Sequence, residues 1–390
     1  MPGDWSALFP WMLLPAAAGA GWWAARRARQ QEGGDNLTAD YFKGLNYLLN
    51  EQPDKAIEVF VRMVEVDRDT LETHFALGNL FRRRGEVDRA IRIHQNLIAR
   101  PALPPEQRAQ ALLALGEDYM RAGLFDRAEN LYKELLELHP RHLGALNCLI
   151  DIYQQEKDWL SAVEALRERA AATGEMQGDV MAQYYCELAA QASARGDAGA
   201  AHRNLDRALA SDPRCARASL LRGELHMQGG AWEEAIAAYK QIEAQDPEFL
   251  SEVIEPLKLC YQRLGRPYDI LPWLQSQVER GAGLSLMLAQ SALLRERDGD
   301  RAAAAFITSE LMRRPSVRGL SRLIELHLAY SEGGARRNLL ILRDLTQKLL
   351  EERPVYRCTQ CGFRGKSLHW QCPGCKRWNT VKPVHGVEGE

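Results

Sequence analysis

The stretch GEDYMRAGLFDRAENLY, residues 116–132, decides the fold because its spacing recurs along the chain. Gly116 is followed twelve residues later by Ala128 and sixteen residues later by the bulky Tyr132. Small residues let two antiparallel helices approach closely, and the larger residue fills the space toward the next helix pair. The stretch therefore predicts one helix–turn–helix unit of a repeat.

The same spacing of small, alanine and bulky residues occurs at five other places. The further sets are Gly44, Ala56 and Phe60; Gly78, Ala90 and His94; Ala162 and Leu166; Ala201 and Leu205; and Gly223, Ala235 and Tyr239. Successive sets are separated by 34, 38, 34, 39 and 34 residues. A period of 34 residues is typical of tetratricopeptide repeats.

The repeat predicts an all-α fold, a tetratricopeptide-repeat superhelix of about eight or nine helical hairpins over residues 37–350. Prolines that end second helices support it, because proline cannot extend a helix; they are Pro140, Pro213, Pro247 and Pro315. After about residue 250 the glycine signature is lost while the helical period continues. We expect two or three degenerate units there, the last acting as a cap.

First helices of the repeat should present a concave surface to partner proteins. By pattern, the side chains that point toward it are those of Asn79, Arg82, Glu117, Met120, Asp151, Gln154, Glu224 and Met227. This set has no dominant charge, so it indicates no particular ligand. Ordinary solvated helix positions are the alternative interpretation for each residue.

Four of the eight cysteines gather near the carboxyl end, in YRCTQCGFRGKSLHWQCPGCKRW. Cys358 and Cys361 form one CxxC turn, and Cys372 and Cys375 form another after a spacer of ten residues. Two such turns brought together predict one metal ion on four thiolates, and iron and zinc both suit that ligand set. The terminal domain, residues 351–390, is too short to fold on apolar burial alone, so the metal should be its core.

The side chains around this metal site can also be predicted. We expect four aromatic residues to wrap the metal, namely Tyr356, Phe363, Trp370 and Trp378. Gly362 and Gly374 supply the backbone freedom that the two turns need. Because four cysteines already complete a tetrahedral set, His369 should pack beside the site and not bind the metal.

The amino-terminal segment predicts a membrane anchor over residues 1–29, followed by a linker at 30–36. The 21 residues from Trp5 to Ala25 carry no charge, and as a helix they would span about 31 Å, enough for a bilayer core. Basic residues follow this segment directly, which predicts the amino terminus outside the membrane and the bulk of the chain in the cytoplasm. A cleaved signal peptide would carry its basic residues before the apolar stretch, and an interfacial helix would need a polar face.

Composition and motifs exclude several classes of function. A formal net charge of -2 gives no attraction to nucleic acid. The sequence contains no P-loop, no GxGxxG after a strand, no HExxH and no GxSxG. The sequence therefore predicts a protein that binds other proteins and is not an enzyme.

The whole chain resembles the lipopolysaccharide assembly protein B family, which has the same order of membrane helix, tetratricopeptide units and rubredoxin-like metal domain. The resemblance is most specific in GNLFRRRGEVDRAIRIHQ, YMRAGLFDRAE, YYCELA and YRCTQCGF…WQCPGCKRW. It implies that Cys358, Cys361, Cys372 and Cys375 bind the metal. The short spacer between the turns departs from true rubredoxins and puts electron transfer in doubt.

The resemblance also implies a function and a place in the cell. It implies a single-pass protein of the inner membrane, its amino terminus periplasmic, that acts with the membrane protease FtsH to promote degradation of the deacetylase LpxC. Other lipopolysaccharide synthesis or transport proteins are further expected partners, and a homo-oligomer is possible. Two alternatives stay open: a rubredoxin-like electron-transfer protein, and a general scaffold for envelope-assembly enzymes without a role in proteolysis.

Overall fold

The structure is a computed structural model of the 390-residue chain. It describes residues 41–47, 49–50, 52–66, 71–101, 103–351 and 354–384. The predicted membrane helix at residues 5–25 and the linker at 30–36 lie outside the described residues. Within the described part, each helix is too short or too polar to cross a lipid bilayer.

The described chain is almost entirely helical and divides into two compact units, the first ending at Lys157 and the second beginning at Asp158, with Ala171–Thr173 counted in the first. The first unit contains a helical segment at 41–47 and then α2 (Pro53–Val66), α3 (Leu71–Arg84), α4 (Val87–Ile98), α5 (Pro105–Arg121), α6 (Phe125–Leu138) and α7 (Leu143–Glu156). The predicted all-α repeat fold is confirmed.

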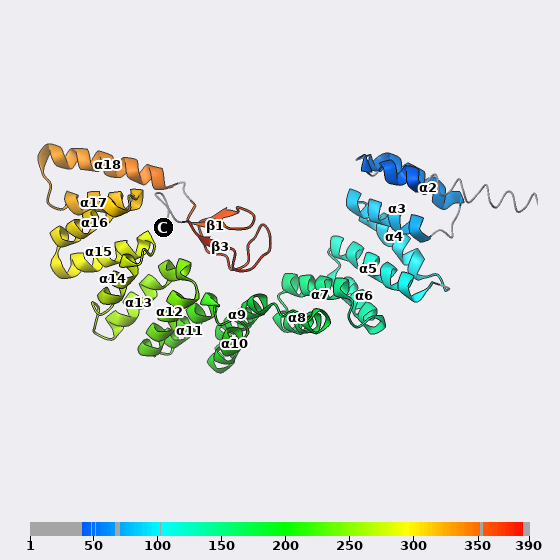
Figure 1. Cartoon of the computed structure of the whole chain (residues 1–390), viewed down its shortest axis with the longest axis horizontal. Coiled ribbons are helices and arrows are strands. Elements are labelled where there is room, and N and C mark those ends of the chain that lie inside the picture. The colour runs from blue at the N-terminus through cyan, green and yellow to red at the C-terminus, as the bar shows by residue number, and fades with distance from the viewer. Residues whose placement is uncertain are drawn as a thin grey trace, which may run out of the picture. The chain divides into compact units, whose positions relative to one another are not determined.

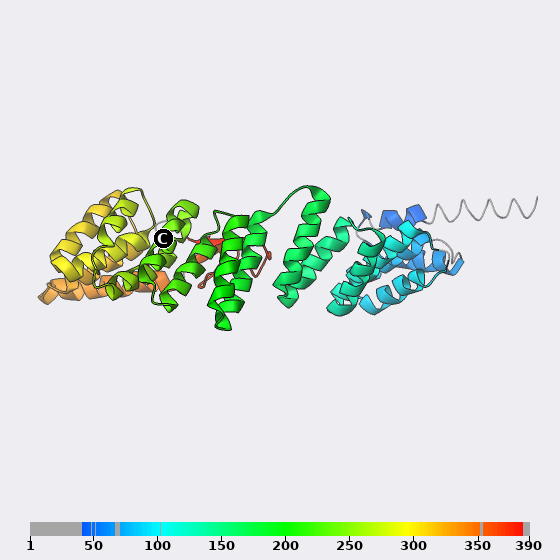
Figure 2. The same cartoon turned by 90° about the horizontal axis from the view of Figure 1, so that it is seen from below.

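The second unit contains the remaining helices and a small sheet (Figure 1). Its helices are α8 (Trp159–Thr173), α9 (Gly178–Ala194), α10 (Ala198–Ser211), α11 (Ala216–Gln228), α12 (Trp232–Gln245), the 3-10 turn η2 (Pro247–Phe249), α13 (Leu250–Arg263), α14 (Leu271–Glu279), α15 (Leu284–Asp298), α16 (Asp300–Arg313), α17 (Val317–Leu328) and α18 (Gly333–Glu351). Its strands are β1 (Tyr356–Cys358), β2 (Arg364–Gly365) and β3 (Val381–Pro383). Figure 2 shows the same elements after a quarter turn.

Five of the second helices bury the same three positions, spaced by four and then three residues, whereas α8 buries the first two, Ala162 and Leu166. The buried sets are Ala56, Phe60 and Met63 in α2; Ala90, His94 and Leu97 in α4; Ala128, Tyr132 and Leu135 in α6; Ala201, Leu205 and Ala208 in α10; and Ala235, Tyr239 and Ile242 in α12. Residues with this spacing lie on one face of a helix. The sequence repeat is therefore a repeat of buried contacts.

Direct contact explains why the repeat begins with glycine. A Cβ atom built on Gly116 would lie 2.4 Å from a ring carbon of Tyr132, and one on Gly223 would lie 2.4 Å from Tyr239. Both distances are shorter than any real carbon contact, so even alanine would displace the ring. The small residue and the bulky residue sixteen positions later are partners across the helix pair.

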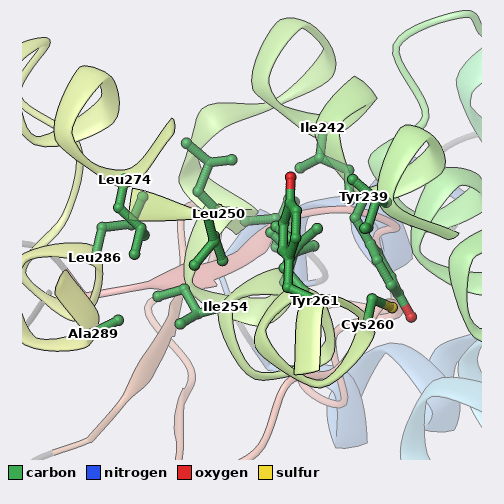
Figure 3. Close-up of a cluster of buried hydrophobic side chains, with 14 of the residues drawn as sticks. Tyr239, Ile242, Leu250, Ile254, Cys260, Tyr261, Leu274, Leu286 and Ala289 are labelled. Atoms are coloured by element: carbon green, nitrogen blue, oxygen red, sulfur yellow. The ribbon is translucent and has the colours of Figure 1, made fainter. Parts of the chain in front are cut away.

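The expected helix ends and the degenerate units are also present. Helices α6, α10, α12 and α16 each end two residues before one of the predicted prolines. Beyond Pro247, the helices α13 to α18 supply three further pairs. Figure 3 shows side chains of α12 to α15, among them Tyr239, Leu250 and Leu286, in one buried cluster.

The last helix differs from the cap that we expected. Helix α18 packs on α17, yet Ile341, Leu342, Leu345 and Leu349 are each about half exposed or more, at 60%, 49%, 53% and 58%. A terminal repeat that caps a solenoid normally has a polar outer face. In this respect α18 keeps the character of an internal helix.

Candidate metal centre

The terminal sheet brings the two CxxC turns together. Strand β1 pairs antiparallel with β2 and with β3, giving the strand order β2-β1-β3. Cys358 is the last residue of β1, and Cys372 lies next to a bridge between Gln371 and Trp378. Cys358 and Cys372 are buried, whereas Cys361 is exposed.

The four sulfur atoms have the geometry that a metal ion requires. The four Sγ atoms lie within 4.8 Å of one another, with 3.8 Å between Cys358 and Cys375 and 3.6 Å between Cys361 and Cys372. A tetrahedron with metal–sulfur bonds of about 2.3 Å has sulfur–sulfur edges of about 3.8 Å. The residues therefore fit one metal ion, and the four cysteines form a tetrathiolate site.

Backbone groups around Cys358 favour the thiolate form that binds metal. The N–H groups of Gln360 and Cys361 point at its Sγ, at 3.4 and 3.5 Å. Burial alone would raise the pKa of Cys358, but its hydrogen bond with Thr380 and these two N–H groups outweigh burial and lower the pKa to about 6. Because metal binding requires the thiolate, this arrangement prepares the site for its ligand.

The two turns use different residues for the sharp change of direction. Gly362 has a φ of 76°, as expected. The expectation for Gly374 was wrong, since the residue with positive φ in the second turn is Lys376, at 59°. Gly374 instead lies close to a metal ligand, because a Cβ atom there would lie 3.3 Å from the Sγ of Cys361, a tight contact.

Of the four aromatic residues expected around the metal, only two pack there. Tyr356 and Phe363 contact the buried cluster of Cys358, Cys372 and Val381. The expectation was wrong for Trp370 and Trp378, whose rings turn away toward the helices. His369 packs against the ring of Phe363 at a centroid distance of 5.9 Å.

The two tryptophans seat the terminal domain on the helices of its own unit. Trp370 packs on Phe249 at 4.9 Å between ring centroids, and Trp378 packs on Trp159 and Tyr184 at 5.8 and 6.0 Å. In Figure 1 strands β1 and β3 lie on the inner side of the curved row that α9 to α18 form. The metal domain thus lies against the helices of the second unit, on their inner side.

An arginine on α11 contacts both tryptophans. The guanidinium of Arg217 on α11 lies 5.6 Å from the ring centroid of Trp370 and 5.9 Å from that of Trp378. The same group donates a hydrogen bond of 2.8 Å to Glu187 on α9. A desolvated cation–π contact contributes about 2 kcal/mol, so these two contacts of one buried guanidinium help to hold the metal domain on the helices.

Polar contacts complete the docked interface. The hydroxyl of Tyr356 donates a hydrogen bond of 2.7 Å to Glu252 on α13. The ammonium of Lys382 forms an ion pair with Asp246 and lies 4.1 Å from the ring centroid of Phe249. These partners are more than one hundred residues apart in the chain, so no sequence pattern marks them. Sequence reasoning consequently missed Arg217, Trp159 and Asp246.

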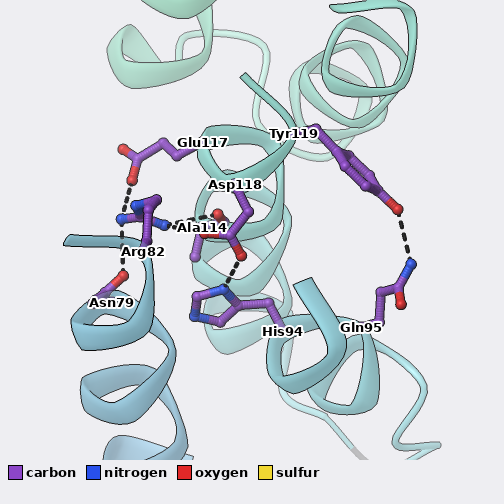
Figure 4. A network of polar contacts seen from close by, with 8 residues as sticks. All are labelled: Asn79, Arg82, His94, Gln95, Ala114, Glu117, Asp118 and Tyr119. Carbon is purple, nitrogen blue, oxygen red and sulfur yellow. Dashed lines mark hydrogen bonds and ion pairs between the residues drawn. The ribbon is translucent and has the colours of Figure 1, made fainter. Parts of the chain in front are cut away.

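Three of the predicted partner-facing residues take part in a partly buried network between repeats (Figure 4). Arg82 on α3 donates to Asn79 at 2.9 Å and to Glu117 on α5 at 2.5 Å. It also donates to Asp118 at 2.8 Å, and Asp118 contacts His94 of α4 at 2.5 Å. The side chains of Asp118 and His94 are fully buried, so this network holds neighbouring repeats together.

The other predicted partner-facing residues lie on α5, α7 and α11. Met120 and Gln154 are half-buried, while Asp151 is exposed. On α11, Glu224 is exposed and Met227 accepts a hydrogen bond of 3.1 Å from the hydroxyl of Tyr239. The eight residues therefore occupy several helices of both units, and their role as a partner surface stays a prediction.

Family comparisons agree with both parts of the chain. Models of the tetratricopeptide repeat match residues 73–109, 113–175 and 186–248. A model described as a rubredoxin metal binding domain matches residues 356–383. Fold and site together define a tetratricopeptide-repeat protein that ends in a rubredoxin-type metal-binding domain.

Full-length relatives then identify the family. Lipopolysaccharide assembly protein B of Escherichia coli strain K12 is 40% identical over 382 residues, covering 97% of this chain and 98% of that protein. The protein of the same name from Haemophilus influenzae is 35% identical over 392 residues, with the same coverage. The chain belongs to the lipopolysaccharide assembly protein B family.

Solved structures also include similar repeat arrays. A tetratricopeptide repeat protein from Parabacteroides merdae is 14% identical, covers 80% of this chain and 99% of its own, and has a TM-score of 0.36.

Proposed function

We propose that this chain is a non-enzymatic adaptor of lipopolysaccharide synthesis, anchored in the inner membrane with its repeats in the cytoplasm. The observation that carries the proposal is the seating of the metal domain on the helices through Arg217, Trp370 and Trp378. A closed tetrathiolate site leaves no open coordination position for a substrate. The metal therefore has a structural role, keeping the terminal domain folded against the helices.

The proposed clients are those that the family resemblance implies. The adaptor would present the deacetylase LpxC to the membrane protease FtsH and so limit the supply of lipid A precursor. An adaptor fixed beside a membrane protease raises the effective concentration of a bound soluble substrate without new chemistry. The eight predicted residues on first helices are candidates for this contact, although Arg82 also serves the network between repeats.

Deleting residues 1–30 tests the role of the anchor. We expect a folded chain that no longer lowers the deacetylase level in cells, because client and protease are no longer brought together. The matched control replaces residues 1–30 with an unrelated single-pass helix of the same orientation, which should restore regulation. If the truncated chain lowered the deacetylase level as much as the full chain does, a membrane-anchored adaptor would be ruled out.

Electron transfer is the second candidate, and the exposure of Cys361 favours it, because an exposed ligand lets electrons reach the metal. The metal itself, iron or zinc, decides between the two functions. Regulation of the deacetylase by a chain loaded only with zinc would reject electron transfer. A chain that binds other lipopolysaccharide synthesis enzymes without changing the deacetylase level would instead be a general scaffold.

A further inference from the structure

A hollow of about 250 Å³ lies between α9 and α11. Small side chains of α9 line one wall, and larger residues of α11 line the other. The residues that matter here are Ala190, Ser193 and Ala194 on α9 and Leu221, Glu224 and Gln228 on α11. The space stays open because the α9 side chains are too short to fill it.

The hollow continues the surface on which the metal domain sits. Arg217, Leu221, Glu224 and Gln228 are spaced by four, three and four residues, so they follow one another along a single face of α11. Arg217, at the start of this row, is covered by Trp370 and Trp378 of the metal domain. The later part of the row borders the hollow and remains open to a partner.

The two carboxylates of this surface differ in their partners. Glu187 accepts a hydrogen bond from Arg217, whereas among the described residues we find no hydrogen bond or ion pair to Glu224. Although Glu224 is exposed, partial desolvation raises the pKa of its carboxyl, and the cation of Arg217 only partly offsets this. A cation placed in the hollow would favour the ionised carboxylate.

The size of the hollow limits what can enter it. Pockets for whole small-molecule ligands usually measure about 300–1,000 Å³, so this one is suited to a single side chain. Long basic side chains lay their apolar stems along apolar surface and direct the charged group to a polar one. Leu221 and Ala194 offer the apolar surface, and Glu224 and Gln228 offer acceptors.

We propose that this hollow receives one arginine or lysine side chain from an extended segment of a partner polypeptide. The stem would pack between α9 and α11, and the cation would pair with Glu224. The inference rests on the proposed adaptor function and adds the chemistry by which the second unit selects its client.

The test titrates the full chain into two fluorescein-labelled nonapeptides of alanine and serine, read by fluorescence polarisation. One peptide has a central arginine, and the other has citrulline, which has nearly the same shape without the charge. We expect the arginine peptide to bind at least five times more tightly. Glu224→Gln should bring the ratio to about one, while Glu234→Gln, at an exposed carboxylate on α12, should leave it unchanged.

A second variant separates shape from charge. Ala194→Leu fills the hollow and should weaken binding of the arginine peptide at least fivefold, with unchanged circular dichroism. Equal affinity for the two peptides, no binding of either, or an unchanged ratio in Glu224→Gln overturns the inference. The peptide titration contains neither the protease nor the deacetylase. A failure of the adaptor function in cells would therefore not change the outcome of the titration.

Discussion

The helical array and the terminal metal domain stabilise their folds in different ways. In the array, each helix buries residues against its sequence neighbours, and the same contact recurs from Gly44 and Phe60 to Gly223 and Tyr239. Among the described residues of the metal domain, the buried cluster consists of Cys358, Cys372 and Val381, so four thiolates must replace the missing core. Substitutions in the array should therefore lower its stability by graded amounts. Loss of a metal ligand should instead unfold the terminal domain completely.

The largest expected effect is loss of a metal ligand. Cys358→Ser should abolish metal binding and unfold the terminal domain, because structural zinc contributes about 10–16 kcal/mol of binding free energy in small domains. The helices should stay folded. Metal content by mass spectrometry and far-ultraviolet circular dichroism measure the two parts separately. Cys148→Ser, at a half-buried array thiol, should retain the metal; a metal-bound Cys358→Ser chain would contradict complete unfolding of the terminal domain.

The next effect concerns the buried network of the array. Asp118→Ala leaves Arg82 and His94 without their shared carboxylate and should cost about 3–5 kcal/mol in the free energy of unfolding. Urea unfolding of the full chain measures it. Asp206→Ala is the control, since that carboxylate is 71% exposed in its pair with Arg222 and should cost less than about 1 kcal/mol. If Asp118→Ala lowered the free energy of unfolding as little as Asp206→Ala does, the network would not be stabilising.

Overpacking of the repeat contact should have a smaller effect. Gly223→Ala brings a Cβ atom onto the ring of Tyr239 and should lower the free energy of unfolding by about 1–3 kcal/mol. Gly334→Ala in α18 meets no atom within 4 Å and should raise it by about 0.5–1 kcal/mol. Thermal unfolding distinguishes these opposite signs. The idea would be falsified if Gly223→Ala stabilised the chain as much as Gly334→Ala.

The smallest effect concerns the backbone of the metal turns. Lys376 has a φ of 59°, which costs a non-glycine residue about 1–2 kcal/mol. Lys376→Gly removes that strain but adds entropy to the unfolded chain. We therefore expect the free energy of metal binding to become more favourable by less than about 1 kcal/mol. Gly362→Ala should have the opposite sign, because Gly362 has a φ of 76°. Competition with a chelator measures both as changes in metal affinity.

Much of the fold was predictable because its determinants are local. Gly116 and Tyr132 contact each other within one helix pair, so their spacing in the sequence reflects their contact in space. The four cysteines were predictable for the same reason, since each CxxC turn brings two ligands together within four residues. The error at Gly374 arose because either a positive φ or a close contact requires glycine, and sequence does not distinguish the two.

The amino-acid sequence by itself determined the repeat, its helix ends and the metal ligands, since each depends on residues within about forty positions of one another. Only the tertiary structure decided where Trp370 and Trp378 point, that Arg82 is tied to Asp118, and that Glu224 borders an open hollow. Those features depend on which side chains of different elements meet, and no repeated spacing marks them; Arg82 and Asp118, for example, are 36 residues apart. The burial and the partners of a side chain at such a contact depend on how the folded elements pack, and the spacing of residues in the sequence does not predict them.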